Sequence, residues 1–378
     1  MGTMKIPLSH KDYTVGWICA LPLEMAAAKA MLDEVHPDLS SSVSDHNTYT
    51  LGTMSSHNIV IACLPLGVYG TTSAAIVASQ MMSRFPSLRF SLMVGIGGGV
   101  PSRDTDIRLG DVVVSKPTKG FGGVVQYDYG KTIRGGRFER TGTLNKPSPL
   151  LLTVVNRLQA DNLLKGCNLS QHLSRLAAMT SSHTSEFTYP GQEEDQLFRP
   201  DYDHMDPRRS CESCDHTQLV NRPVRSSTEP RIHYGLIASS NQVVKDGKTR
   251  DRLARQLGII CFEMEAAGLM DHFPCLVIRG ISDYSDFHKN DQWQGYAAAT
   301  AAAYSKELLA VVPPVEFVQT DPADVRSTAA AESSPMSPER SVYSGTFFSG
   351  GGPMFLGNQN AGRDINIRTG SHSRGSGF

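Results

Sequence analysis

The sequence lacks a net charge of either sign and any long apolar run. Its 378 residues carry 36 Lys and Arg against 37 Asp and Glu, a formal net charge of −1. This balance gives no global field to attract nucleic acid or an acidic membrane surface, so we expect neither as a partner. No apolar run is long enough to cross a bilayer. The first residues, MGTMKIPLSHKDY, contain no apolar signal region, and we expect a cytoplasmic protein.

The sequence also lacks a disulfide pattern. Its seven cysteines are scattered and odd in number, and several lie inside apolar runs, which favours reduced thiols. Cys211 and Cys214 form a single CxxC, and a zinc site would need two more ligands, for which His204 and His216 are near in sequence. Because no second CxxC or spaced pair of histidines is present, we interpret them as two ordinary reduced thiols. We predict no bound metal and no cofactor.

What the sequence does contain is an alternation of strand and helix patterns that predicts an α/β fold. Strands are expected at 13–21, 48–54, 58–64, 92–94, 107–115, 231–238, 259–262 and 275–278. The second and third of these form a hairpin, and 122–129 is expected to pair antiparallel with 107–115. Helices are expected at 23–32, 70–82, 149–159, 249–257, 266–273 and 292–312.

Composition divides the chain into three parts. An α/β domain covers 12–313, with an irregular polar insertion at 165–230 that has no steady period. Residues 314–340 read as a linker rich in Ser, Thr, Ala and Pro, and 341–378 as a disordered tail rich in Gly and Asn. The alternative for this tail is a short cross-β segment, because Asn and Gln ladders and stacked Phe suit in-register stacking.

Acidic residues stand at the predicted strand ends, where ligands bind in open α/β sheets. Glu263 and Glu265 follow one strand, Asp283 follows another, and Glu24 lies at the junction between the first strand and its helix. For any one of these acids alone, a helix cap, a charge at a helix N-terminus or a salt bridge is the ordinary role. Together they favour a catalytic site. The glycine cluster GIGGGV (95–100) is either a tight turn or a close approach to a ligand.

Three motifs in register extend this interpretation. ICALPLEM, VGIGGGVP and CFEMEAAG…VIRGISDYSD resemble the superfamily of nucleoside phosphorylases and methylthioadenosine/S-adenosylhomocysteine nucleosidases, over 12–313 apart from the insertion. The likeness is greatest to the nucleosidase-type domain of fungal NOD-like receptor proteins. It implies a three-layer domain, with a central mixed sheet flanked by helices, and a homo-oligomer. The tail resembles amyloid-signalling motifs and implies a NOD-like receptor as a partner.

The resemblance also implies roles for individual residues. Asp283 matches the acid that protonates purine N7, and Glu24 matches the base that activates water. Glu265 matches the carboxylate that holds the ribose hydroxyls, with Met264 packed against the sugar, and we place Glu263 with them in the substrate site. Gly97 and Gly98 match the loop that approaches the sugar or its attacking nucleophile. Val243 and Val244 lie on the base-binding strand, where the family usually has an aromatic residue, and Trp293 is our candidate for stacking on the base.

The expected reaction is hydrolysis of the N-glycosidic bond of an adenine nucleoside or nucleotide. Phosphorylases of this superfamily carry phosphate-binding arginines in the first loop and near the glycine loop, and this chain has Glu24 in the first and no arginine in SLMVGIGGG. Phosphorolysis, or a binding and assembly module that acts through its tail, are the alternatives. A nucleotide such as ATP is suggested by basic residues near the expected mouth: Arg103, Arg108, Lys116, Lys131, Arg134, Arg137, Lys245 and Lys248. Adenosine or a thioether nucleoside is its competitor.

Overall fold

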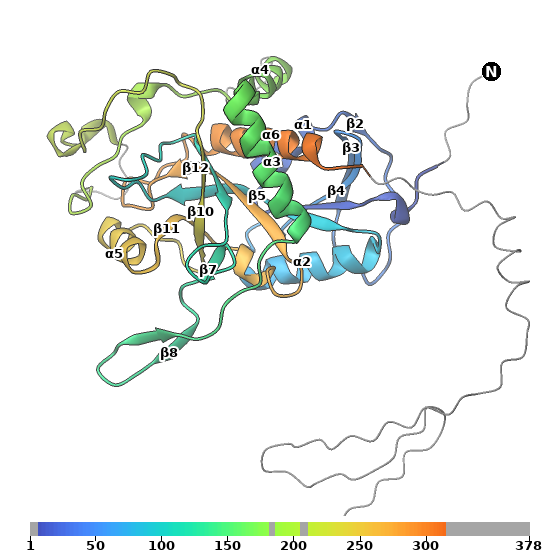
Figure 1. Ribbon diagram of the computed structural model, residues 1–378, viewed down its shortest axis with the longest axis horizontal. Helices are drawn as coiled ribbons and strands as arrows, with labels where there is room; N and C mark the ends of the chain where they lie inside the picture. The colour runs from blue at the N-terminus through green and yellow to red at the C-terminus, as the bar shows by residue number, and fades with distance from the viewer. Residues whose placement is uncertain (1–6, 181–185, 205–210, 315–378) are drawn as a thin grey trace, which may run out of the picture. The chain divides into compact units, whose positions relative to one another are not determined.

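One ten-stranded sheet organises the computed structural model, which describes residues 7–180, 186–204 and 211–314 (Figure 1). The expected linker and tail, from residue 315 onward, lie outside the described residues. The remaining part is the predicted mixed sheet with helices on both faces. This confirms the predicted fold class.

The first half of the sheet is built around β1 (Val15–Cys19), a fully buried strand. It lies parallel to both β4 (His57–Cys63) and β5 (Phe90–Gly99). The predicted hairpin is confirmed, since β3 (Tyr49–Met54) pairs antiparallel with β4, and the short β2 (Glu34–Val35) completes this edge. Because β5 continues through Gly95–Gly99, the glycine cluster is a strand and not a turn.

The second half of the sheet closes on itself. β12 (Cys275–Asp283) is parallel to β5 and antiparallel to β6 (Val112–Ser115). β6 is parallel to β10 (Ile232–Ser239), which is parallel to β11 (Ile259–Glu263). β11 then pairs antiparallel with β5, so five strands form a closed circuit. This closure brings the end of β11 beside the glycines of β5, with Phe262 opposite Gly98.

One predicted pairing is wrong. β7 (Val124–Gln126), inside the 122–129 segment, pairs parallel with β10 instead of antiparallel with the 107–115 segment. The reason is that both edges of β6 are already occupied, by β10 and β12. After β7, the chain forms a separate hairpin of β8 (Gly130–Thr132) and β9 (Phe138–Arg140).

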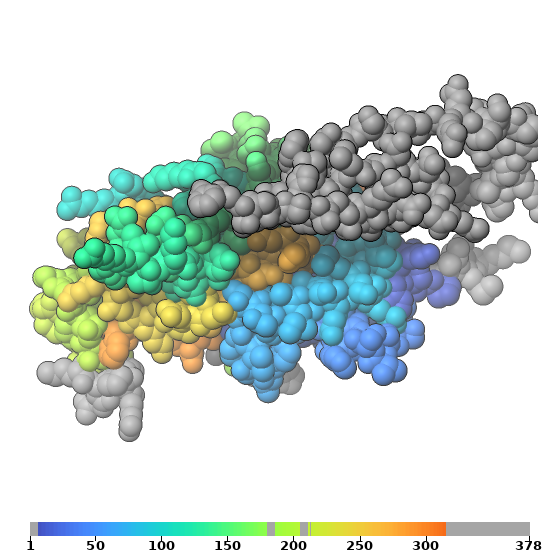
Figure 2. Space-filling model, turned by 90° about the horizontal axis from the view of Figure 1, so that it is seen from below, coloured from blue at the N-terminus to red at the C-terminus, as the bar shows by residue number. Residues whose placement is uncertain are grey.

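Helices cover both faces of the sheet and give it two cores. The first core packs α1 (Pro22–Ala30), α3 (Pro149–Lys165), α4 (Leu169–Thr180) and α6 (Gln294–Val311) on the sheet. The second core packs α2 (Thr71–Arg84) and the 3₁₀ turn η5 (Ala266–Gly268) on the other face. Alternate residues of β1 divide between them, Trp17 entering the first core and Ile18 the second. In the view from below, α2 and α5 (Gly247–Leu257) lie on the same face of the domain (Figure 2).

The helix α6 is apolar around most of its circumference because it is buried between the sheet and other helices. Its alanines keep it thin, and Gly280 of β12 leaves room for its backbone, since a Cβ there would clash with the carbonyl of Ala297. Among the described residues, no helix has the length and apolar character needed to cross a membrane.

Two further expectations need correction. The insertion is not without a period, because α4 presents Leu169, Leu173 and Leu176 to the core at helical spacing. Elsewhere its described parts contain three three-residue turns, η2 (Gln192–Glu194), η3 (Cys211–Ser213) and η4 (His216–Gln218), and an isolated antiparallel bridge between Phe198 and Leu219. In place of the helix expected at 266–273, the structure has only the turn η5. Glu263 accepts the N–H of Ala266 where this turn begins, and β12 starts at Cys275, so the connection between the two strands is short. A similar turn, η1 (His10–Asp12), precedes β1.

Candidate active site

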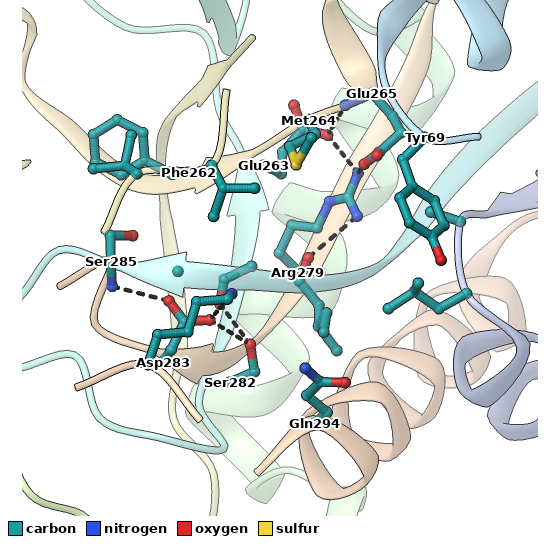
Figure 3. Close-up of a pocket in the computed structure, with 18 of the residues that line it drawn as sticks. Tyr69, Phe262, Glu263, Met264, Glu265, Arg279, Ser282, Asp283, Ser285 and Gln294 are labelled. Carbon is teal, nitrogen blue, oxygen red and sulfur yellow. Dashed lines mark hydrogen bonds and ion pairs between the residues drawn. The ribbon is translucent and has the colours of Figure 1, made fainter. Parts of the chain in front are cut away.

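The ends of β1, β5, β11 and β12 surround a cavity of about 250 Å³ (Figure 3). The structure brings together nine of the ten residues expected there. The nine are Glu24, Gly97, Gly98, Val243, Val244, Glu263, Met264, Glu265 and Asp283. The three carboxylates assigned to the reaction therefore share one pocket.

Glu24 is buried and held rigidly at the start of α1. Its Oε2 accepts the backbone N–H groups of Ala20 at 2.7 Å and Leu21 at 2.9 Å, as in a capping box. Its Oε1 accepts the N–H of Ile96 at 2.7 Å, and the missing side chain of Gly95 leaves the space that this carboxylate fills. Burial raises the pKa of Glu24, an effect that Arg279 and the three N–H donors offset in part. A buried carboxylate with a raised pKa is suited to act as a general base.

Arg279 of β12 is the buried cation at the centre of the site. Its Nη1 donates to the carbonyl of Ile96 at 3.2 Å, and its Nη2 pairs with Glu263 and, at 3.4 Å, with Glu265. Figure 3 shows the guanidinium directed at these two glutamates. Burial alone would lower the pKa of Arg279, but Glu263, Glu265 and Glu24 outweigh it and raise the pKa. The arginine therefore offsets part of the charge of the three carboxylates, and both of its Nη atoms are engaged.

Glu263 and Glu265 differ in how fully their oxygens are used. Glu263 pairs closely with Arg279 and accepts the N–H of Ala266 at 2.9 Å, where it caps η5. Among the described residues, Glu265 has only two long contacts, to Arg279 and to the N–H of Gly70, each 3.4 Å. Burial raises the pKa of Glu265 to about 7, with Arg279 opposing and the neighbouring glutamates adding to the rise. Glu265 thus keeps acceptor capacity for a ligand, while Glu263 positions Arg279.

Asp283 is the last residue of β12, and a bulge in the β12–β5 pairing lies between Ile281 and Asp283. The bulge lets two consecutive side chains, Ser282 and Asp283, line the same pocket. Asp283 Oδ1 accepts the N–H of Ser285 at 2.9 Å, and Oδ2 contacts Ser282 Oγ at 2.9 Å and Lys289 Nζ at 2.5 Å. Three residues of one short segment, Ser282, Ser285 and Lys289, therefore fix the orientation of this carboxyl group.

Gly98 provides the space for that arrangement. A Cβ at Gly98 would lie 2.8 Å from Oδ1 of Asp283 and would overlap Ser285 Oγ. At Gly97 a Cβ would lie 2.8 Å from the sulfur of Cys261 and 2.9 Å from the carbonyl of Phe262. The glycines therefore allow β5, β11 and β12 to approach closely at the pocket.

Trp293, the tenth expected residue, does not line the pocket. It is 1 % exposed, donates its indole N–H to the carbonyl of Glu194 at 3.2 Å and packs against Tyr189 and Tyr296. It begins a core helix, and an indole with that many partners is a core residue. Phe262 and Tyr69 are the aromatic residues that do line the pocket, and neither was singled out from the sequence.

None of the eight basic residues expected near the mouth lines this pocket. Arg108, for example, is buried beside Asp106, and Lys131 pairs with Glu139 in the β8–β9 hairpin. The two cations that do line it, Arg279 and Lys289, were missed in the sequence. Arg279 lies inside the VIRGISD motif, between Glu265 and Asp283. Its place between these two acids is the feature of the sequence that could have marked it.

Comparison with known proteins places this geometry in context. A sequence model of the phosphorylase superfamily matches residues 14–315. A nucleotide-binding leucine-rich repeat (NLR)-like protein from Hyaloscypha variabilis is 49% identical over 308 residues, which cover 81% of this chain and 30% of that protein. The 5'-methylthioadenosine/S-adenosylhomocysteine nucleosidase of Mycobacterium bovis is 24% identical, over 79% of this chain and 97% of that enzyme.

Two more known proteins are similar to most of this chain. The ATP nucleosidase Cap17 of Escherichia coli is 24% identical, over 77% of this chain and 50% of that protein. The solved structure of futalosine hydrolase from Helicobacter pylori superposes with a TM-score of 0.50 at 16% identity, over 80% of this chain and 99% of that one. The chain thus spans under a third of the NLR-like relative's length and half of Cap17's.

Proposed function

Because this chain belongs to the phosphorylase superfamily, we propose that it hydrolyses the N-glycosidic bond of an adenine nucleoside or nucleotide and releases adenine. The observation that carries the proposal is the convergence of Glu24, Glu265 and Asp283 on one pocket. Two relatives with nucleosidase names support the reaction class. The NLR-like relative supports a role as the enzymatic module of a signalling or immune protein.

The proposed chemistry divides the work between the carboxyl groups. The C1′–N9 bond breaks with its electron pair passing to the purine, and Asp283 gives a proton to N7 of the departing base. General acid catalysis of this kind contributes about 10²- to 10⁴-fold. Glu265 accepts hydrogen bonds from the ribose hydroxyls and stabilises the positive charge that develops on the sugar. Glu24 takes a proton from the water that forms the new C1′–O bond.

Water is favoured over phosphate as the nucleophile by the charges that line the pocket. Arg279 is surrounded by three carboxylates and Lys289 is paired with Asp283. A phosphate dianion would therefore meet Glu24, Glu263 and Glu265 without an unengaged cation among the described pocket residues. Like charges repel strongly at close range in a partly buried site, so these carboxylates disfavour a phosphate ion there.

The proposal is tested by incubating the protein with adenosine, methylthioadenosine and ATP, with and without phosphate, and measuring adenine by chromatography. We expect adenine release that does not depend on phosphate and that falls strongly in Glu24→Gln. The matched control is Glu139→Gln, an exposed glutamate of the β8–β9 hairpin that should leave the rate unchanged. Release that requires phosphate and yields a sugar phosphate would establish the phosphorylase alternative instead. The substrate that reacts fastest identifies the group at the 5′ end.

The raised pKa of Glu265 predicts a pH dependence. The ionised carboxylate accepts from the sugar hydroxyls, and protonation removes that acceptor, so kcat/KM should fall as the pH drops below about 7. The expected slope is about tenfold per pH unit on the acid side. Profiles between about pH 5.5 and 8.5 measure it. In Glu265→Gln kcat/KM should be lower throughout, with the step near neutrality lost, and a wild-type profile that stays flat down to pH 5.5 would contradict this role.

A further inference from the structure

A second cluster of reactive side chains lies outside the proposed active site, where the insertion meets the loop after β12. It consists of His204, Cys211, Cys214 and His288. His204 Nε2 lies 3.4 Å from the sulfur of Cys211 and 3.9 Å from that of Cys214, and its Nδ1 lies 3.4 Å from the latter. One ligand atom each from His204, Cys214 and His288 lie within 4.8 Å of one another. The turn η3 places the two thiols close together, with the N–H of Cys214 donating to the carbonyl of Cys211 at 3.0 Å.

His288 is an independent sign of a ligand at this cluster. His288 is 7 % exposed, and neither of its ring nitrogens has a hydrogen-bond partner among the described residues. The ring is fixed by stacking on Phe198 at 4.0 Å and on Tyr202 at 5.5 Å between centroids. Its centroid lies 4.6 Å from that of His204. The carboxylate of Asp286 lies 3.8 Å from Nδ1, too far for a hydrogen bond. A buried imidazole without a hydrogen bond is costly, and a metal ion would satisfy it.

The two sulfur-to-nitrogen distances at His204 fit a tetrahedral zinc ion. Zn–S bonds of about 2.3 Å and Zn–N bonds of about 2.0–2.1 Å at tetrahedral angles place sulfur and nitrogen about 3.5 Å apart. The observed separations of 3.4 and 3.9 Å between the sulfurs and His204 Nε2 bracket that value. Two thiolates and two imidazoles are a donor set that selects zinc over the hard cations magnesium and calcium.

We propose that His204, Cys211, Cys214 and His288 bind one structural Zn²⁺ ion. Four protein ligands complete the coordination, so the ion has no open position for catalysis. The sequence predicted two ordinary thiols here, because one ligand, His288, is distant in the chain and no spacing pattern marks it. His216, the other candidate by spacing, is not among the residues that cluster with His204, Cys214 and His288.

The ion would tie the insertion to the segment that carries the general acid. His288 adjoins Lys289, whose ammonium contacts Asp283, and the Cys211 thiol lies 3.8 Å from the carbonyl of His288. Zinc would thus hold the 284–289 segment in place, and its removal should make that segment more mobile. This consequence for activity rests on the proposed function, but the metal site does not.

The test is the metal content of the full chain purified under reducing conditions with zinc supplied, measured by mass spectrometry. We expect about one zinc per chain. The zinc content should drop to near zero in the double variant Cys211→Ser/Cys214→Ser and should fall strongly in His288→Asn. The matched control is Cys63→Ser/Cys167→Ser, which changes two other partly buried free thiols and should keep the zinc.

A second measurement does not depend on any variant folding. Cobalt exchanged into the wild-type chain should give the visible bands of a tetrahedral ion and the near-ultraviolet bands of thiolate ligation. A wild-type chain that retains no zinc and gives no such cobalt spectrum would overturn the proposal. So would equal loss of zinc from the control variant, or a disulfide between Cys211 and Cys214 in the reduced, metal-supplied protein.

Discussion

Asp283→Asn should lower kcat for adenine release by about 10²- to 10⁴-fold, because an amide is too weak an acid to protonate the purine. The replacement keeps the size of the side chain and can still accept the N–H of Ser285. Substrate binding should therefore change less than turnover, which makes this variant a test of the proton transfer itself. Steady-state rates of adenine release, followed by chromatography, give kcat and KM separately.

The control for this variant is Asp291→Asn, an exposed aspartate of the same loop, which should retain full activity. The Asp283 variant must also unfold at a denaturant concentration close to that of the wild type. A folded Asp283→Asn protein with unchanged kcat would remove Asp283 from the reaction.

Arg279→Met is expected to destabilise the folded protein by about 3–5 kcal/mol, as is usual when one partner of a buried ion pair is removed. Arg279 is 1 % exposed, and its loss leaves Glu24, Glu263 and Glu265 without the cation that offsets their charge. Equilibrium unfolding in urea measures the change. Arg255→Met, at an exposed arginine of α5, is the matched control and should cost little.

The pH dependence of that loss identifies its cause. Burial already raises the folded-state pKa of Glu24 and Glu265 above the unfolded value, and the loss of Arg279, which opposes that rise, should raise both further. A group with a raised folded-state pKa lowers the free energy of unfolding as the pH rises from its unfolded pKa through its folded pKa. The loss of stability in Arg279→Met should therefore be larger at pH 8 than at pH 5. A penalty that is the same at both pH values would indicate lost packing rather than uncompensated charge.

The sequence predicted those parts of the fold and site that depend on local patterns. Apolar runs marked β1, β4, β10 and β12, and the Ala-rich segment marked α6. Acids at strand ends marked Glu24, Glu265 and Asp283, since parallel strands deliver their carboxyl ends to a shared edge. These are features that a short window of residues contains.

What the sequence could not predict depends on contacts between distant segments. The pairing of β11 with β5 closes the sheet, and no local signal announces it. Trp293 and Phe262 were indistinguishable as aromatic residues until the packing buried one in the core and placed the other at the pocket. His288 approaches Cys211, 77 positions earlier, only because the insertion folds back on the loop after β12.

The measurement that most directly tests the central claim is the fate of the sugar oxygen when the reaction runs in oxygen-18 water with phosphate present. If Glu24, Glu265 and Asp283 together direct water at C1′, rapidly quenched and reduced sugar product should carry one heavy oxygen at C1′, in amounts equal to the adenine released. A product that carries phosphate at C1′, or adenine release that continues undiminished when all three carboxyl groups are replaced by amides, would contradict the account.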